Sequence, residues 1–193
     1  MAEQVPDLPV EEFPTAKAWE RWLSRNHATS DGLWLKLAKK GTGVTTVDIV
    51  DAIEVALCYG WIDGLRHKLD DVYFRQRFTP RKPRSKWSQI NRDRAEALIA
   101  AGRMRPAGQA QVDAAKADGR WAAAYAGSRT IEVPDDLTRA LRRNAAARRA
   151  FAALDSTNRY AILFRIHDAK RPETRARRIE QFVTMLAEGR TIH

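Results

Sequence analysis

Residues 61–85 read WIDGLRHKLDDVYFRQRFTPRKPRS, and this stretch decides the fold of the first half of the chain. Two runs suited to extended structure, residues 61–68 and 72–79, flank the acidic pair Asp70 and Asp71. Runs of this length around a polar turn predict a β-hairpin. We therefore expect a sheet built on this hairpin at the centre of the first half of the chain.

The second strand of the predicted hairpin has one basic face and one apolar face. Because side chains alternate along a strand, Tyr73, Arg75 and Arg77 fall on the same face. Phe74 and Phe78 fall on the opposite face. The apolar face suits a core, so the basic face is the one that the sequence offers to a ligand.

Upstream of the hairpin, the pattern predicts a helix, a strand and a second helix. The first helix begins after the N-cap Thr15 and ends at about His27. Leucines alternate with other residues over 33–37, which predicts a strand. Thr45 or Thr46 is the expected N-cap of the second helix. The expected buried stripe of that helix consists of Ile49, Val50, Ile53 and Leu57.

Downstream of the hairpin, the chain is predicted to become helical. A helix ends near Gly102, and an alanine-rich helix follows over residues 106–118. Four further helix starts are expected at Pro134, Asn144, Ser156 and Pro172. Residues 1–130 are therefore predicted to form an α+β N-terminal domain, and residues 131–193 a helical C-terminal module. The fold class is α+β: a small antiparallel sheet of at least three strands with helices, followed by an all-helical C-terminal module.

The positive charge of the chain is concentrated in two segments. The 193 residues carry 34 Lys and Arg against 24 Asp and Glu, a net charge of +10. Residues 66–105 hold 12 against 4, and residues 138–193 hold 13 against 5, so each segment has a net charge of +8. Such segments attract phosphates and acidic partners. The alternative is that their arginines are solvated helix faces.

The sequence predicts a cytoplasmic protein. Cys58 is the only cysteine, which rules out an intramolecular disulfide and suits a reducing compartment. The N-terminal segment MAEQVPDLPVEEFP has neither the basic nor the apolar region of a secretory leader. No apolar run approaches the ~20 residues that cross a bilayer, so no membrane association is expected.

The residues predict neither a metal site nor a cofactor. His27, His67, His167 and His193 are scattered, without the paired spacing of metal ligands. The turn at residues 41–43, Gly-Thr-Gly, matches only half of a dinucleotide fingerprint and is interpreted as a helix-capping turn. No catalytic motif is present, so we assign no catalytic residues.

We predict one anion site at the end of the hairpin. Arg75 and Arg77 lie about 7 Å apart on one strand face, and the proline-bearing loop after them adds further arginines. Arginine binds phosphate or carboxylate through two hydrogen bonds, and the next helix start adds free N–H groups. The predicted ligand-binding residues are Trp61, Tyr73, Arg75, Arg77, Arg81, Arg84, Ser85, Trp87 and Ser88. The alternative is structural pairing of these arginines, for example of Arg77 with Asp63.

Three strings of the sequence resemble one known family. They are LCYGWIDG at 57–64, QRFTPRKPRS at 76–85 and NRYAI at 158–162. The first two are similar to the N-terminal part of the YdeI/OmpD-associated family, also labelled bacteriocin-protection proteins, and the third to its C-terminal helical module. The resemblance implies a role in bacteriocin protection or stress response. It carries over no catalytic residue.

Three functions are compatible with these patterns. The first is a non-enzymatic binding protein whose 73–91 segment contacts an anionic ligand, either nucleic acid or a phosphorylated molecule. The second is an enzyme acting on a phosphate- or carboxylate-bearing small molecule, with Asp63, His67, Tyr73 or Ser85 beside the arginines. The third is a protein-interaction module with an acidic partner. The patterns assign no oligomeric state.

Overall fold

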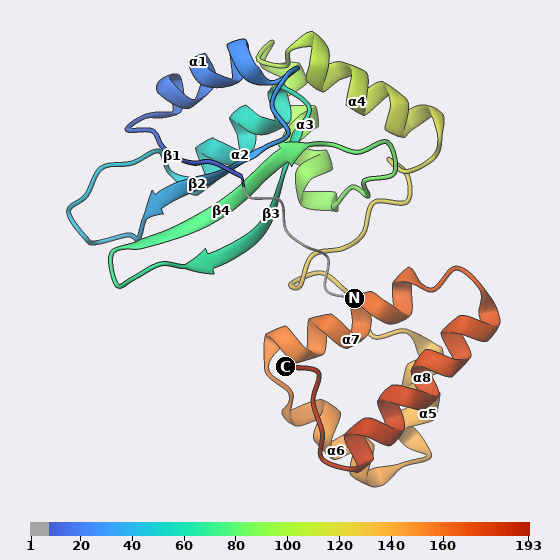
Figure 1. Ribbon diagram of the computed structural model, residues 1–193. Helices are drawn as coiled ribbons and strands as arrows, with labels where there is room; N and C mark the ends of the chain where they lie inside the picture. Colours follow the sequence, from blue (N-terminus) through green and yellow to red (C-terminus); the bar gives the residue numbers. More distant parts are fainter. Residues whose placement is uncertain (1–7) are drawn as a thin grey trace. The chain divides into compact units, whose positions relative to one another are not determined.

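The computed structural model describes residues 8–193, which divide into two compact units (Figure 1). The N-terminal unit ends at Ala124, and the C-terminal unit runs from Tyr125 to His193. The first combines a sheet with helices and the second is all helical, which confirms the predicted fold class. Residues 1–7 lie outside the described residues. They form half of the N-terminal segment MAEQVPDLPVEEFP, whose composition predicts that no secretory leader is present.

The sheet has four strands in the order β1-β2-β4-β3. They are β1 (Val10–Glu12), β2 (Leu33–Ala38), β3 (Trp61–Lys68) and β4 (Tyr73–Pro80). The predicted hairpin is confirmed as the antiparallel pair β3 and β4, and β2 is antiparallel to β4 on its other side. The short edge strand β1 was not predicted, and it pairs parallel with β2. The sheet is therefore mixed.

Four helices of the N-terminal unit lie on one side of the sheet (Figure 1). They are α1 (Ala16–Asn26), α2 (Ile49–Cys58), α3 (Gln89–Ala100) and α4 (Pro106–Ala117). Leu33, Leu35 and Leu37 of β2 and Phe78 of β4 face these helices and are fully buried with them in one core. The alternation of β2 and β4 leaves the other sheet face for Trp34, Lys36, Tyr73, Arg75 and Arg77.

Helix α2 differs from its prediction at its start and on its buried side. Its N-cap is Asp48, whose side chain accepts a hydrogen bond from Val50 N at 2.8 Å. Thr46 is not the cap, because its Oγ1 accepts from the backbone N–H of Ala38 at 2.9 Å. Val50 is exposed, and the buried residues are Ala52, Val55, Ala56, Leu57 and Cys58. The predicted stripe was therefore wrong at Val50, whereas Ile49 and Ile53 are half-buried and pack against the core, and the burial of Cys58 is confirmed.

The C-terminal unit is a bundle with its own core. Its helices are α5 (Asp135–Arg142), α6 (Ala145–Ala153), α7 (Ser156–Asp168) and α8 (Pro172–Ala187). Asn144 caps α6 as predicted, whereas Asp155 rather than Ser156 caps α7, because its carboxylate accepts from Asn158 N at 2.7 Å. The core includes the fully buried Leu137, Ile162, Leu163 and Ile166, together with the ring of Phe151.

Candidate functional site

The sheet face opposite the helices carries a compact group of aromatic and cationic side chains. We call it the open face and define it by Trp34, Lys36, His67, Tyr73, Arg75 and Arg77. The pairing register brings them together from three strands. Trp34 lies opposite Arg77, Lys36 opposite Arg75, and His67 opposite Arg75 from the other side. Residues distant in sequence thus become neighbours on one surface.

Trp34 lies beneath the His67 and Arg75 side chains of the open face. The His67 ring lies 4.8 Å from the Trp34 ring, tilted by 32°, and the guanidinium carbon of Arg75 lies 4.5 Å from it. Arg75 Nη2 is also 3.5 Å from His67 Nδ1. These two side chains cover the indole, which is only 4% exposed although it lies outside the helix-covered core. Trp34 therefore holds the Arg75 guanidinium against the sheet through a cation–π contact.

A second cation–π pair lies at the start of β4. Lys36 Nζ is 3.8 Å from the centre of the Tyr73 ring and forms a 2.9 Å ion pair with Glu12 of β1. The hydrogen bond to Glu12 raises the pKa of the Lys36 ammonium above its usual value. The hairpin turn positions Tyr73, because the Asp70 carboxylate accepts hydrogen bonds from the N–H groups of Tyr73 and Val72. These two hydrogen bonds lower the pKa of Asp70 below its usual value.

Arg77 lies against a bulge in β3. The pairing of β3 with β4 shifts register between Asp63 and Arg66, and the buried Gln76 fixes the bulge by donating from Nε2 to Gly64 O at 2.7 Å. A Cβ atom at Gly64 would lie 3.1 Å from Arg77 Nε. Glycine at this position therefore leaves the guanidinium of Arg77 the space to lie against the bulge.

The Nε–H groups of Arg75 and Arg77 are both buried, and neither finds a hydrogen-bond acceptor among the described residues. A buried donor without an acceptor costs about 1–3 kcal/mol. No ion pair joins Arg77 to Asp63 within residues 8–193, so the alternative of a structural pair between them finds no support in the contacts. An acceptor supplied by a ligand would remove the cost of both donors.

The structure separates the residues predicted to form one anion site into two groups. Tyr73, Arg75 and Arg77 lie together on the open face. Trp61 lies on the helix side, where it is 1% exposed, packs against Trp19 and Trp22 of α1 and donates from Nε1 to His27 O. It is therefore part of the core and does not form a wall beside Tyr73.

The loop after β4 is fixed by contacts within the N-terminal unit. Arg81 is buried with its guanidinium carbon 3.7 Å from the Trp87 ring and donates to Lys86 O. Trp87 is buried in turn, with its ring 4.8 Å from that of Trp121. These residues form a structural stack in the core.

The two predicted serines have structural contacts, and Arg84 is exposed. Ser88 is the N-cap of α3 and accepts from Asn91 N at 3.1 Å. Ser85 Oγ accepts from Lys82 N at 3.1 Å, and its carbonyl oxygen accepts from Arg120 Nη1 at 2.9 Å. The serines close the loop and start the helix, while Arg84 is free to reach a ligand at the end of β4.

Sequence reasoning missed two members of the open face, Trp34 and Lys36, and named His67 only in the alternative of an enzyme. Alternation in residues 33–37 already placed Trp34 and Lys36 on the polar side of their strand. The register that sets Trp34 opposite Arg77 joins residues 43 positions apart. The two predicted strands each carry aromatic and basic residues on their polar faces. Pairing these two faces with each other would have predicted that Trp34 and Lys36 belong to the site.

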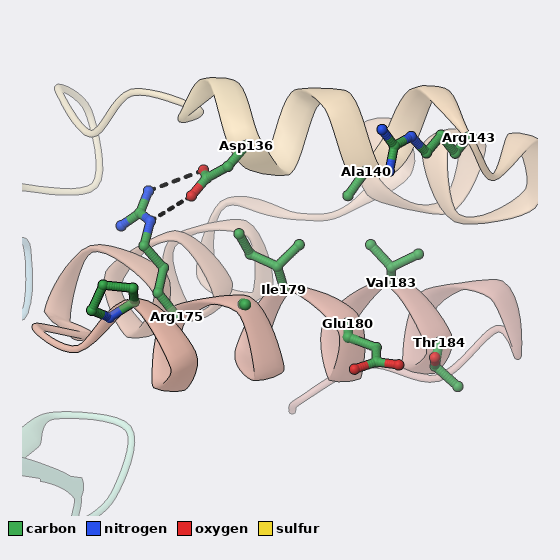
Figure 2. Close-up of a pocket in the computed structure, with 10 residues that line it drawn as sticks. Asp136, Ala140, Arg143, Arg175, Ile179, Glu180, Val183 and Thr184 are labelled. Carbon is green, nitrogen blue, oxygen red and sulfur yellow. Dashed lines mark hydrogen bonds and ion pairs between the residues drawn. The ribbon is translucent and has the colours of Figure 1, made fainter.

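The C-terminal unit contains a groove between α5 and α8 (Figure 2). Its volume is about 510 Å³, and Ala140, Ile179 and Val183 line it. At one end Arg175 donates from Nε and Nη2 to the two carboxylate oxygens of Asp136, at 2.5 and 3.0 Å. These hydrogen bonds lower the pKa of Asp136. The pair joins α5 to α8 and satisfies the charge of Arg175, so this end of the groove is structural.

Residues 8–193 offer neither a cluster of metal ligands nor a helix suited to span a membrane. No three His, Cys, Asp or Glu side chains in that part of the chain are grouped as metal ligands would be. Over the same residues, no helix combines the length and apolar character needed to cross a membrane. The open face, with the buried donors of Arg75 and Arg77, is the candidate site.

The fold and the open face define a two-unit α+β protein with a cationic and aromatic sheet surface. Residues 11–111 match the family described as "Domain of unknown function (DUF8412)"; the match spans more than half of the 193 residues, and the chain belongs to this family. Residues 130–189 match the family described as "Bacteriocin-protection, YdeI or OmpD-Associated". This match confirms the resemblance to that family through the string at 158–162, whereas the strings at 57–64 and 76–85 lie within residues 11–111. No curated protein and no solved structure matches the chain.

Proposed function

We propose that the open face binds an anionic ligand through phosphate oxygens. The observation that carries the proposal is the pair of buried Nε–H donors of Arg75 and Arg77, which lack acceptors among the described residues. Arginine is suited to phosphate because its planar fork donates two parallel hydrogen bonds. Phosphate would supply the acceptors that the sheet does not.

The geometry supports an anion between these two arginines. Residues two apart on a strand project from the same face at a spacing of about 7 Å, so both guanidinium groups can donate to one phosphate or to two neighbouring ones. Trp34 restrains Arg75, and the bulge at Gly64 receives Arg77. Restrained donors lose less conformational entropy when the anion binds.

Titration with inorganic tripolyphosphate tests the proposal. Arg75→Gln and Arg77→Gln should each weaken binding by about ten-fold or more, since a hydrogen bond to a charged group contributes about 1.5–3 kcal/mol. Arg21→Gln is the matched control, because Arg21 is exposed on α1, on the helix side of the sheet. Absence of binding by the unmodified chain at low salt, or equal losses in all three variants, would refute the proposal.

The match over residues 130–189 supports a second proposal, for the C-terminal unit. Its description names bacteriocin protection, and we propose that this unit contributes to such a role. Survival of a bacteriocin-sensitive strain is compared with and without the chain, and with a chain carrying Asp136→Asn and Arg175→Gln. Equal survival with and without the unmodified chain would contradict this proposal and leave the anion-binding proposal untouched.

A further inference from the structure

Resting on the proposed phosphate site, we infer that the ligand of the open face is a single-stranded nucleic acid that runs along β4, with bases stacked on His67 and Tyr73. Three features carry this inference: the distribution of positive charge along β4, the rings on the same face, and the interleaving of cations and rings across neighbouring strands of one sheet.

The positive charge extends beyond the two arginines to both ends of β4. At its start, Lys36 lies over the ring of Tyr73, and Lys39 donates from Nζ to Asp70 O at 2.7 Å in the hairpin turn. At its end, the loop carries Lys82 and Arg84, both exposed. The eight residues of β4 span roughly 26 Å. Charge spread over this length suits a chain of phosphates better than one phosphate group.

The rings of the open face are placed to receive bases. His67 is exposed, with its ring backed by Trp34. Tyr73 is half-buried, with the ammonium of Lys36 over its ring. Stacking of bases on aromatic side chains is tolerant of sequence and combines with cation–π contacts. Trp34 itself is covered, so it supports a stack without touching a base.

Single strands fit this surface better than duplexes. A duplex keeps its base faces stacked inside and offers only phosphates and groove edges, whereas the bases of a single strand can turn outward onto rings. The open face is formed by neighbouring strands of one sheet, with cations and rings interleaved across them. Such an arrangement contacts the backbone and the bases of one strand at the same time.

The test separates stacking from charge. Binding of the full chain is measured by fluorescence anisotropy with a labelled 12-nucleotide single strand, with the same sequence as a duplex, and in competition with inorganic polyphosphate of equal charge. The single strand should bind at least about ten-fold more tightly than either competitor. His67→Leu and Tyr73→Leu should each weaken single-strand binding by about ten-fold, while polyphosphate binding changes less than about two-fold. Tyr125→Leu, in the C-terminal unit, is the matched control.

Each outcome bears on one of the two proposals. Equal affinity for single strand, duplex and polyphosphate, with no effect of the ring variants, would overturn the single-strand inference and keep the phosphate site. Equal binding of poly-glutamate would overturn it in favour of an acidic protein partner. Failure to bind any polyanion would overturn both. His67 is exposed, so His67→Leu keeps the test decisive if Tyr73→Leu does not fold.

Discussion

The guanidinium carbon of Arg75 lies 4.5 Å from the centre of the Trp34 ring, and this contact buries an indole on the side of the sheet away from the helices. Trp34 therefore contributes both to the stability of the fold and to the candidate site. Its ring excludes water beneath Arg75 and fixes the direction in which that side chain donates. Changes at Trp34 should therefore affect both the unfolding equilibrium and ligand binding.

Trp34→Ala should lower the free energy of unfolding by about 3–5 kcal/mol, the usual cost of removing a large buried aromatic ring. Trp34→Phe keeps a ring under Arg75 and should cost less than about half as much. Urea unfolding of the three proteins measures the difference. A loss below about 1 kcal/mol for Trp34→Ala would show that the Arg75 contact does not bury the ring in solution.

Gly64→Ala should weaken tripolyphosphate binding several-fold and leave the fold nearly unchanged. A Cβ at this position meets only the end of the flexible Arg77 side chain, at 3.1 Å from Nε, so the guanidinium must shift while the backbone need not. Gly60→Ala is the contrasting variant. Gly60 has a φ of +74° after α2, and a Cβ there would lie 2.8 Å from Ala107 O, so the loss should be one of stability.

Calorimetric titration and thermal unfolding of both glycine variants measure these effects. A Gly64 variant with unchanged affinity would indicate that the position of Arg77 on the bulge is unimportant for the anion. A Gly60 variant as stable as the unmodified chain would contradict the close packing of α2 on α4.

Much of the N-terminal unit follows from local sequence patterns. Alternation in residues 72–79 placed Arg75 and Arg77 on one face, and the N-cap Thr15 marked the start of α1 correctly. These features depend on the backbone geometry of one element. They can be predicted because strand alternation and helix capping involve residues only a few positions apart.

The composition of the site could not be predicted in the same way. Whether an aromatic ring lines a site or fills a core depends on tertiary packing, and Trp61 and Trp87 proved to be core residues. Trp34 joined the site through a register that pairs strands distant in the sequence. The edge strand β1 was missed because three residues carry too little periodicity to indicate a strand.

Asp136→Asn should reduce stability at neutral pH by about 1 kcal/mol, a modest value because the carboxylate is one-third exposed. The hydrogen bond from Arg175 holds the pKa of Asp136 below its usual value. A lowered folded-state pKa contributes stability above the unfolded-state pKa, near 4, and the contribution is lost as the pH falls through the folded-state value. The variant should therefore lose less stability on acidification than the unmodified chain.

Asp135→Asn is the matched control for that prediction. Asp135 lies beside Asp136 in the first turn of α5 and shares its favourable position at the helix start, but it forms no ion pair among residues 8–193. Urea unfolding between pH 7 and pH 3 compares the two. Equal pH dependence for both variants would show that the Arg175 pair does not shift the titration of Asp136.

Asn158 joins the N-terminus of α7 to the last residues of the chain. The side chain is buried, its Oδ1 accepts from the N–H groups of Ile192 and His193 at 3.1 and 3.0 Å, and its Nδ2 donates to Asp155 at 3.1 Å. Asn158→Leu would leave these two N–H groups without their acceptor. Because each intramolecular hydrogen bond contributes about 0.5–1.5 kcal/mol, the loss of these bonds should destabilise the C-terminal unit by about 2 kcal/mol.

Asn144→Ala is a suitable comparison, since it removes an amide that only caps α6 and should cost about 1 kcal/mol. Amide hydrogen exchange distinguishes the two effects. In Asn158→Leu the amides of Ile192 and His193 should exchange at least about ten-fold faster than in the unmodified chain, whereas Asn144→Ala should leave them unchanged. Unaltered exchange in Asn158→Leu would mean that the last residues are held by contacts other than this amide, and the stability loss should then fall to that of a simple cap.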